Sequence, residues 1–481
     1  MTSIAKPICD LSATEVSEEL AAGRITSRQV VQTCLDRTDA INPVINAVCT
    51  LNPLALAEAD RSDARRRSGK AFGRLDGIPF FAKDNLETSG LRTTYGSRLY
   101  ETNVPDVDAV SVERLKKAGC VLLGKTNTPE FAHDIKTTNL IFGATRNPFD
   151  LSRTPGGSSG GTAAAIAAGL APIGLGTDLG GSIRIPAAMC AIVGLRPSPG
   201  RVPVWPADFG WDTLVSHVHG PMARSVADLG LMMAVLAGPD DRDPSSLPAP
   251  GTDYAAQPAG IAGSRISYCH DLGGVLPIDD EVGALQRAAV RNFTRLGCTV
   301  EEVSFDASDF SSIVRGTRGF GMVGRYAKRV DEARKKLGPV LLAQVDDAMT
   351  LDLRMVTEAE RARTAYYHRV RLLLERFDYI VTPTIGAVAF PLDGVMPNEI
   401  NGRPIARYAD TYRFPYAFSI TGLPVAAVPC GFTTAGLPVG LQIVARRHRD
   451  DAALAAAAAW VEAFPEFVVT PSRLVLPGVA A

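Results

Sequence analysis

Two serine clusters set between glycines are the residues of this sequence best suited to chemistry. Residues 156–186 read GGSSGGTAAAIAAGLAPIGLGTDLGGSIRIP, which places Ser158 and Ser182 24 positions apart. Glycine accepts positive φ and close backbone approach, so both serines can sit on sharp turns with free hydroxyl groups. Such turns also gather unpaired N–H groups, which suit an anion or an oxyanion. The segment therefore predicts two serines beside an anion or oxyanion pocket.

The elements around these serines must hold them on turns between helices and strands. The alanine-rich run 162–169 predicts a helix that begins after Gly161 and stops at Gly169. Residues 183–186 indicate a turn that leads into a second helix. Short apolar runs broken by Gly and Pro, at 78–82, 120–124, 171–178 and 191–195, alternate with helical stretches such as 109–118. They predict buried strands of an α/β sheet.

From residue 156 to residue 197 the sequence resembles the amidase signature family, Ser-Ser-Lys hydrolases that cleave carboxamides. The resemblance continues in order through 77–85 (GIPFFAKDN), 124–130 (GKTNTPE), 220–224 (GPMAR) and 422–442. One Gly/Ser run would be a weak signal, whereas several ordered blocks around a lysine are specific. The resemblance implies an α/β/α layered fold around a large mixed β-sheet. It also implies cofactor-independent hydrolysis of a small-molecule carboxamide through an acyl-enzyme, with release of ammonia or an amine.

The resemblance also implies a role for individual residues. Ser182 would be the nucleophile, Ser158 the bridging serine after a cis Gly157–Ser158 bond, and Lys83 the base. The oxyanion would be held by the backbone N–H groups of Leu179, Gly180, Gly181 and Ser182. Supporting hydrogen bonds would come from Ser159, Asp178 and Arg184.

The lysine must be neutral in this scheme, because a serine hydroxyl reacts only when an adjacent base takes its proton. The apolar run 78–82 directly before Lys83 suits an amine whose charged form is disfavoured by desolvation. Ser158 would accept the proton of Ser182 and later deliver it to the departing nitrogen. Lys125 lies in the block 124–130 and could be mistaken for the base.

Two other functions compete with this one. Residues 157–161 fit G-x-S-x-G, the nucleophile elbow of α/β-hydrolases, with Ser159 as nucleophile and a later histidine as base. However, the expected H-G-G-G-type oxyanion block is missing. Within the family, the chain could be the A subunit of a glutamyl-tRNA amidotransferase, which releases ammonia from glutamine for a partner. Residues 351–370 lack the tyrosine- and glycine-rich phrase expected for that branch.

Segment 202–211 (VPVWPADFGW) is unusually aromatic and follows the serine clusters closely. As a hypothesis, Trp205, Phe209 or Trp211 lines a pocket for an apolar or aryl acyl group. The alternative is that these rings only pack a loop against the core. The sequence also departs from many family members at 416–421, where they have a Pro-Phe-Asn phrase and this chain has YAFSIT.

Composition limits the partners. The 481 residues carry a net charge of −1, which gives no basic excess for binding nucleic acid or anionic lipid. The first twenty residues lack a secretory pattern, and the eight cysteines form no C-x-x-C pair, so we expect a cytoplasmic protein with reduced cysteines. His217-x-His219 comes closest to a metal pair and is interpreted as a loop. We expect neither metal nor membrane. Dimers are common in the family, so the resemblance leaves a homodimer open as one assembly, and the sequence does not fix the oligomeric state.

The chain divides into four predicted parts. Residues 1–70 form an N-terminal helical segment, with capping boxes at Ser12/Glu15 and Thr26/Gln29 and a break at 42–43. Residues 71–237 form the core with the lysine and both serines. Residues 238–260, rich in Pro, Asp, Ser and Gly, form a linker. Residues 261–481 form a C-terminal α/β part that completes the same core and ends with a hairpin at 423–445 and a helix at 450–464.

Overall fold

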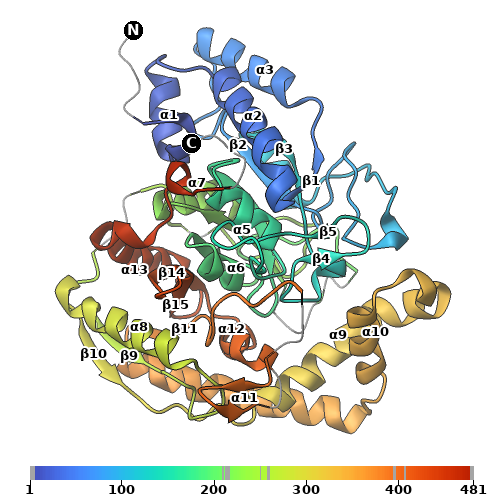
Figure 1. The fold of residues 1–481 in the computed structure, drawn as a ribbon, viewed down its shortest axis with the longest axis vertical. Coiled ribbons are helices and arrows are strands. Elements are labelled where there is room, and N and C mark those ends of the chain that lie inside the picture. The colour runs from blue at the N-terminus through green and yellow to red at the C-terminus, as the bar shows by residue number, and fades with distance from the viewer. Residues whose placement is uncertain are drawn as a thin grey trace.

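A large mixed β-sheet forms the centre of the fold (Figure 1). The computed structural model describes residues 6–208, 211, 217–249, 251–256, 260–393, 397–405 and 408–476. Its strands are β1 (Val48–Leu51), β2 (Pro79–Lys83), β3 (Val121–Thr126), β6 (Ile173–Asp178), β7 (Val193–Arg196), β8 (Val218–Ala223), β9 (Arg265–Tyr268), β10 (Thr299–Glu302), β11 (Tyr379–Pro383), β14 (Val425–Phe432) and β15 (Pro438–Val444). In these residues the sheet has 11 strands, in the order β1-β3-β2-β6-β8-β7-β14-β15-β11-β9-β10. Two short ribbons lie outside it, β4 (Thr138–Asn139) with β5 (Gly143–Ala144) and β12 (Glu399–Ile400) with β13 (Arg403–Pro404).

Strand direction explains where polar groups can meet. β2 pairs in parallel with both β3 and β6, while β6 pairs antiparallel with β8. Because parallel neighbours end at the same edge of a sheet, the last residues of β2 and β6 lie close together. Lys83 is the last residue of β2, and Thr177 and Asp178 are the last two of β6. The edge of the sheet therefore brings a lysine beside a hydroxyl and a carboxylate.

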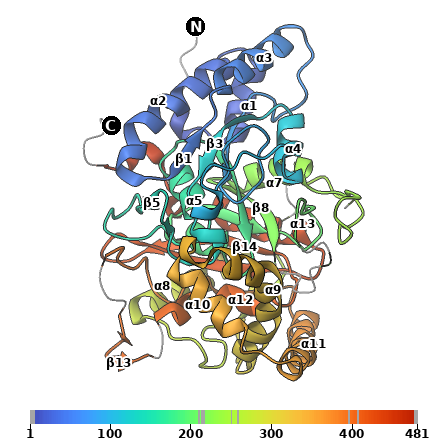
Figure 2. The same ribbon diagram turned by 90° about the vertical axis from the view of Figure 1, so that its right-hand side faces the viewer.

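Helices cover the sheet and extend from it at both ends (Figures 1 and 2). They are α1 (Ala13–Ala21), α2 (Ser27–Ile45), α3 (Ala55–Arg67), α4 (Val110–Lys117), α5 (Gly160–Ala167), α6 (Arg184–Met189), α7 (Val226–Leu236), α8 (Asp280–Arg291), α9 (Phe310–Ala333), α10 (Pro339–Ala348), α11 (Leu353–Arg376), α12 (Phe414–Ser419) and α13 (Asp450–Ala463). α5 packs on β6 and α6 on β14, while α7 and α13 pack together over β8 and β14. The expected layered α/β fold around a large mixed sheet is confirmed.

Most of these helices and strands lie where the local sequence predicted them. Both capping boxes form, at Ser12/Glu15 and at Thr26/Gln29. The four apolar runs become β2, β3, β6 and β7, and the hairpin becomes β14 and β15. The predicted helices after each serine cluster are α5 and α6, and Gly169 follows the first with φ of 71°.

Other predictions of secondary structure were wrong. α2 does not stop at 42–43 but runs through Pro43 to Ile45 and ends at Asn46, which has φ of 50°. Proline in a final turn removes a single hydrogen bond, so tertiary packing can override it. β1 and β8 were missed because each is a short segment that pairs with a distant strand, β3 and β6 respectively. Consequently His219 lies on a strand and not in a loop.

Buried carboxylates hold the N-terminal helices on the core. Asp228 of α7 accepts hydrogen bonds from the N–H groups of Ala13 and Thr14, each at 2.9 Å. Asp63 of α3 accepts from the N–H of Ser27 at 2.7 Å. An aspartate at a helix N-terminus satisfies orphan N–H groups and interacts favourably with the helix dipole. The first turns of α1 and α2 are therefore attached by side chains of other helices.

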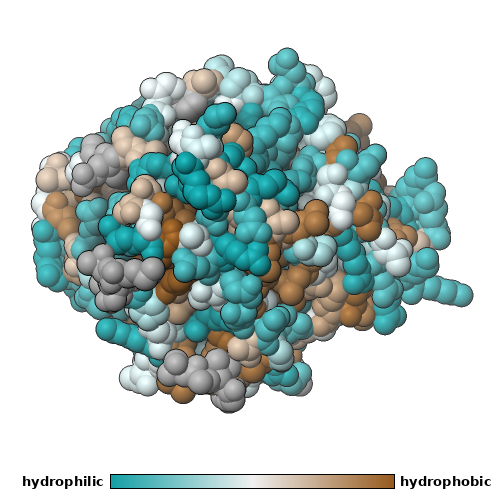
Figure 3. All heavy atoms as spheres, turned by 90° about the horizontal axis from the view of Figure 1, so that it is seen from above, coloured by the Kyte–Doolittle hydropathy of each residue, from teal (hydrophilic) through white to brown (hydrophobic). Residues whose placement is uncertain are grey.

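The surface is mixed in polarity. On the face shown in Figure 3, hydrophilic residues cover most of the area, with smaller groups of hydrophobic residues between them. Among the helices that the structure describes, none is both long enough and apolar enough to cross a membrane.

Candidate active site

Lys83 lies at the end of β2 and is fully buried. Its Nζ lies 2.6 Å from Ser158 Oγ and 2.9 Å from Thr177 Oγ1. Burial lowers the pKa of Lys83 well below the ordinary lysine value, although the nearby Asp178 carboxylate acts in the opposite sense. A buried amine with two hydroxyl neighbours is suited to the neutral form.

Ser158 lies two residues before α5 begins, and the bond that precedes it, Gly157–Ser158, is cis as predicted. Its side chain is fully buried, yet it contributes to the wall of a cavity. A side chain at Gly157 would approach the carbonyl oxygen of Asp134 to 2.7 Å, so close packing explains the glycine. The turn before α5 thus presents one serine to the lysine.

Ser182 lies in the turn between β6 and α6 and lines the same cavity. Its carbonyl oxygen accepts a hydrogen bond from the N–H of Ser159 at 3.0 Å, which ties the two serine turns together. The Ser182 hydroxyl has no hydrogen-bond partner among the described residues. The two serines are therefore brought to one cavity.

The turn between β6 and α6 contains the N–H groups that we expect to form the oxyanion hole, and one of them already has a hydrogen-bond partner. Gly181 N–H donates to Asp178 Oδ1 at 2.8 Å and does not line the cavity. Leu179, Gly180 and Ser182 do line it, and within the described chain their N–H groups have no partner. The N–H of Gly181 therefore holds Asp178 in this structure, and the expected oxyanion hole stays a prediction.

The Asp178 carboxylate holds this turn in place through hydrogen bonds and ion pairs. Its carboxylate also accepts from Ile183 N–H at 3.2 Å and pairs with Arg184 at 3.0 Å and Arg196 at 3.4 Å. All three charged side chains are fully buried. Burial alone would raise the pKa of Asp178, but Arg184 and then Arg196 outweigh it and hold that pKa well below the ordinary value. Burial lowers the pKa of Arg196 to about 10. The carboxylate therefore stays charged and fixes the turn.

Ser159 is buried and does not line the cavity. Its hydroxyl lies 3.3 Å from both the N and the O of Thr177. A serine enclosed by backbone is poorly placed to attack a substrate, so the structure gives no support to the nucleophile-elbow interpretation. Lys125 is also excluded from the cavity wall, since its Nζ bonds to Thr88 Oγ1 at 2.7 Å and to the carbonyl oxygen of Leu86. Burial lowers the pKa of Lys125 to about 8.

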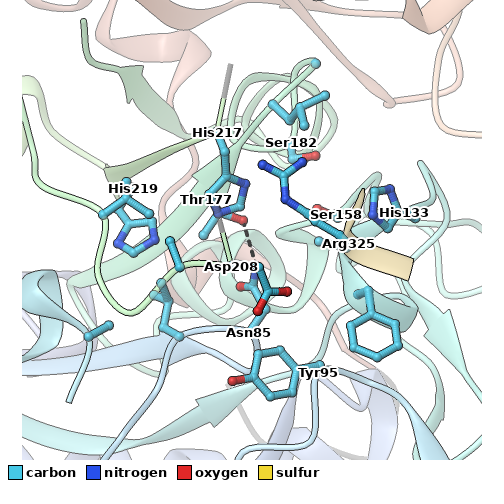
Figure 4. A pocket seen from close by; sticks show the side chains of 18 of the residues that line it. Asn85, Tyr95, His133, Ser158, Thr177, Ser182, Asp208, His217, His219 and Arg325 are labelled. Atoms are coloured by element: carbon cyan, nitrogen blue, oxygen red, sulfur yellow. Dashed lines mark hydrogen bonds between the residues drawn. The ribbon is translucent and has the colours of Figure 1, made fainter. Parts of the chain in front are cut away.

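The cavity has a volume of about 980 Å³. Figure 4 shows Ser158 and Ser182 with Asn85, Thr177, His217 and Arg325 around it, and Asn85 donates to Thr177 Oγ1 at 3.1 Å. Burial lowers the pKa of His217 to about 3, and the Arg325 charge adds to this. The imidazole is therefore neutral at ordinary pH. Such a volume accommodates a molecule of drug size.

The chain matches known proteins over most of its length. A family model described as amidase matches residues 29–454. An acylamidase of Rhodococcus erythropolis is 34% identical over 455 residues, which cover 93% of this chain and 94% of the relative. The chain belongs to the amidase family. The A subunit of the glutamyl-tRNA(Gln) amidotransferase of Chloroflexus aggregans is 39% identical to this amidase over 465 residues, covering 91% and 93%.

Solved structures agree with this membership. The crystal structure of a bacterial aryl acylamidase of the amidase signature family superposes with a TM-score of 0.89 at 31% identity, and covers 98% of this chain and 100% of that chain. The resemblance to the amidase signature family is confirmed, and the amidase is a hydrolase that acts on amide C–N bonds.

Segment 202–211 lines the cavity in part, but not through the two tryptophans that we expected there. In the amidase the Trp205 ring lies 4.7 Å from the Arg242 guanidinium, and Trp211 is 76% exposed. Neither of these two described indoles lines the cavity, whereas Val204 and Pro206 do. Phe209 lies outside the described residues.

Several cavity residues of this amidase were missed from the sequence. Thr177, next to Asp178, could have been found as a hydroxyl at the end of a strand. Asn85 follows Lys83 within the same block, whereas His133, His217 and Arg325 carry no local signal. Within the described residues, no three His, Cys, Asp or Glu side chains gather in a way that could hold a metal ion.

Proposed function

We propose that the protein hydrolyses a small-molecule, non-peptide carboxamide through a Ser182–Ser158–Lys83 triad and an acyl-enzyme. The observation that carries the proposal is the buried Lys83 amine, which lies 2.6 Å from the Oγ of Ser158. Ser158 in turn lines the same cavity as Ser182. Amide hydrolysis needs a nucleophile, a proton carrier and stabilisation of the oxyanion, and these residues can supply each of them.

The proton is passed from Ser182 to Ser158 and from Ser158 to Lys83. Ser182 Oγ attacks the carbonyl carbon and gives its proton to Ser158, while Ser158 gives its own proton to the neutral Lys83 amine. When the C–N bond breaks, Ser158 delivers a proton to the departing nitrogen and recovers one from Lys83. Ammonia or an amine leaves, and water then releases the acid from Ser182 by the same proton path in reverse. The low pKa of Lys83 supports this role, because a protonated amine could not accept.

The negative oxygen formed by the attack would be held by three N–H groups. Leu179, Gly180 and Ser182 line the cavity, and Asp178 fixes the turn by accepting from Gly181 at 2.8 Å. Donors that are already oriented need no rearrangement as the charge develops. A fixed turn therefore supports acyl transfer.

The alternative is the A subunit of a glutamyl-tRNA amidotransferase-type complex. It is favoured by the 39% identity to the A subunit of Chloroflexus aggregans. Residues 351–370, where the sequence lacks the expected glutamine-recognition phrase, contribute no lining residue to the cavity. The two functions differ in one respect that can be measured, since a subunit needs its partner whereas a free-standing amidase acts alone.

Labelling by a fluorophosphonate tests the nucleophile directly. Mass spectrometry of the intact protein and its peptides should show one phosphonyl group on Ser182 in the wild type. The Ser182→Ala protein should lose the label, whereas the control Ser159→Ala should keep it. Labelling of Ser159 instead would contradict the proposal. If the wild type takes no label and turns over no amide unless a partner is added, the subunit function is favoured.

A further inference from the structure

Aromatic rings cover one side of the cavity and have no part in the proposed reaction. The aromatic wall consists of Tyr95, Tyr100, Phe131, His133 and Tyr326, all of which line the cavity. Ring centroids lie 5.0 Å apart for Tyr95 and Tyr100, 6.0 Å for Tyr95 and Phe131, and 5.2 Å for Phe131 and Tyr326. These rings come from three segments distant in sequence, and Figure 4 shows Tyr95 and His133 around the cavity that contains both serines.

The backbone of the aromatic wall is unusual. Tyr95, Phe131 and Ala132 have φ of 55°, 46° and 63°, a left-handed conformation that side chains other than those of Gly, Asn and Asp seldom adopt. Phe131 N–H donates to the carbonyl oxygen of Tyr95 at 2.7 Å and ties the two left-handed segments together. Strained backbone that tertiary structure holds in place is typical of ligand-binding sites.

Contacts from the helices α9 and α10 hold the residues of the aromatic wall in position. Arg318 of α9 donates to His133 Nδ1 at 2.9 Å, and Gln344 of α10 donates to the carbonyl oxygen of the same residue at 2.9 Å. Glu130, next to Phe131, accepts from the N–H of Gly338 at 2.6 Å. The rings are thus positioned before any ligand binds, which lowers the cost of ordering on binding.

The charged side chains near the aromatic wall decide which kind of planar group it binds best. Aromatic faces attract cations as well as neutral rings. Here the Arg329 guanidinium lies 5.8 Å from the Tyr326 ring centroid and pairs with Asp208 at 2.9 Å. Arg318 donates a hydrogen bond to His133. Because the charges nearest the rings already have partners, a neutral ring fits the wall better than an ion.

We propose that the aromatic wall is a subsite that binds a neutral aryl group of the amide. This inference rests on the proposed function, because it concerns the substrate of the same cavity. The volume of about 980 Å³ leaves room for an amide that reaches from Ser182 to the wall. The aryl group can belong to the acyl part or to the amine part, and matched substrates distinguish the two.

Phe131→Leu tests the subsite, because it keeps an apolar side chain but removes the aromatic face. Each aryl amide is paired with its saturated counterpart: benzamide with cyclohexanecarboxamide, and acetanilide with N-cyclohexylacetamide. We expect Phe131→Leu to lower kcat/KM for one aryl amide by about 3- to 10-fold, the size of a ring–ring contact, and to change its saturated counterpart less than about 2-fold. The control is Phe149→Leu, a ring that packs against Phe432 at 5.8 Å and does not line the cavity. It should not alter the ratio for either pair.

A binding measurement separates this inference from the proposed mechanism. In Ser182→Ala protein, calorimetric titration should show tighter binding of the aryl amide than of its saturated counterpart, and Phe131→Leu in that background should remove the difference. Equal losses for the aryl and saturated amides would overturn the subsite, and so would equal binding of both. Continued hydrolysis by Ser182→Ala would instead contradict the assignment of the nucleophile and leave the binding comparison valid.

Discussion

Asp178→Asn is the substitution whose effect follows most directly from the structure. The carboxylate is fully buried and accepts from two arginines and from the N–H groups of Gly181 and Ile183. An amide keeps the size of the side chain but loses the charge, and its NH₂ group faces donors. Two buried guanidinium groups would then lack a counter-charge.

The magnitude can be worked out from this arrangement. Removal of one partner from a buried ion pair costs about 3–5 kcal/mol of unfolding free energy. Unfolding entropy of about 2.1 cal/mol/K per residue gives roughly 1 kcal/mol/K for the 481 residues. Asp178→Asn should therefore lower Tm by about 3–5 °C. Activity should fall as well, because Asp178 also holds the turn that presents the proposed oxyanion donors.

Scanning calorimetry checks this prediction against a matched surface change. Asp347→Asn removes an exposed ion pair with Arg315 at 3.0 Å and should leave Tm within about 1 °C of the wild type. The sign with pH follows from the lowered pKa of Asp178. Its stabilisation is complete above the unfolded pKa of about 4 and is lost only as pH falls through the lower folded pKa. The Tm difference should therefore stay constant from about pH 5 to pH 8. An Asp178→Asn protein that melts with or above the wild type would refute the reasoning.

Two further predictions concern the reaction. Lys83→Met should lower kcat/KM for an amide by about 100-fold or more, and the wild-type rate should rise with pH through the lowered pKa of Lys83 and then level off, because the neutral amine is the base. A pH–rate profile that falls over the same range would contradict a neutral base. Gly180→Ala would place its Cβ inside the ring of Tyr416 and should lower kcat/KM by about 10-fold or more, since small displacements of reacting groups are costly. Adding Tyr416→Ala should restore part of that loss in a double-mutant cycle, and simple additivity would count against a steric cause.

The part of the site that could be predicted is the part made of contiguous sequence. The turns that carry Ser158 and Ser182 need glycine for close approach, so their geometry is visible in composition: a side chain at Gly181 would approach Pro415 Cβ to 2.7 Å. The lysine could be placed at a strand end because five apolar or small residues precede it. Gly181 N–H was assigned to the oxyanion because the sequence does not reveal that Asp178 accepts from it.

The aromatic wall could not be predicted, for a physical reason that also explains the error over Trp205 and Trp211. A search for aromatic residues close in sequence finds rings that share a segment, whereas the wall joins rings from residues 95–100, 131–133 and 326. Two of these segments contain a residue with a left-handed backbone, Tyr95 and Phe131. Tyrosine and phenylalanine are not typical turn residues, so the sequence does not indicate a turn at either position. Neither residue type favours this left-handed conformation locally, so long-range contacts, such as those of α9 and α10, must stabilise it. Substrate preference in this amidase would then depend on how these helices dock as well as on the serine turns.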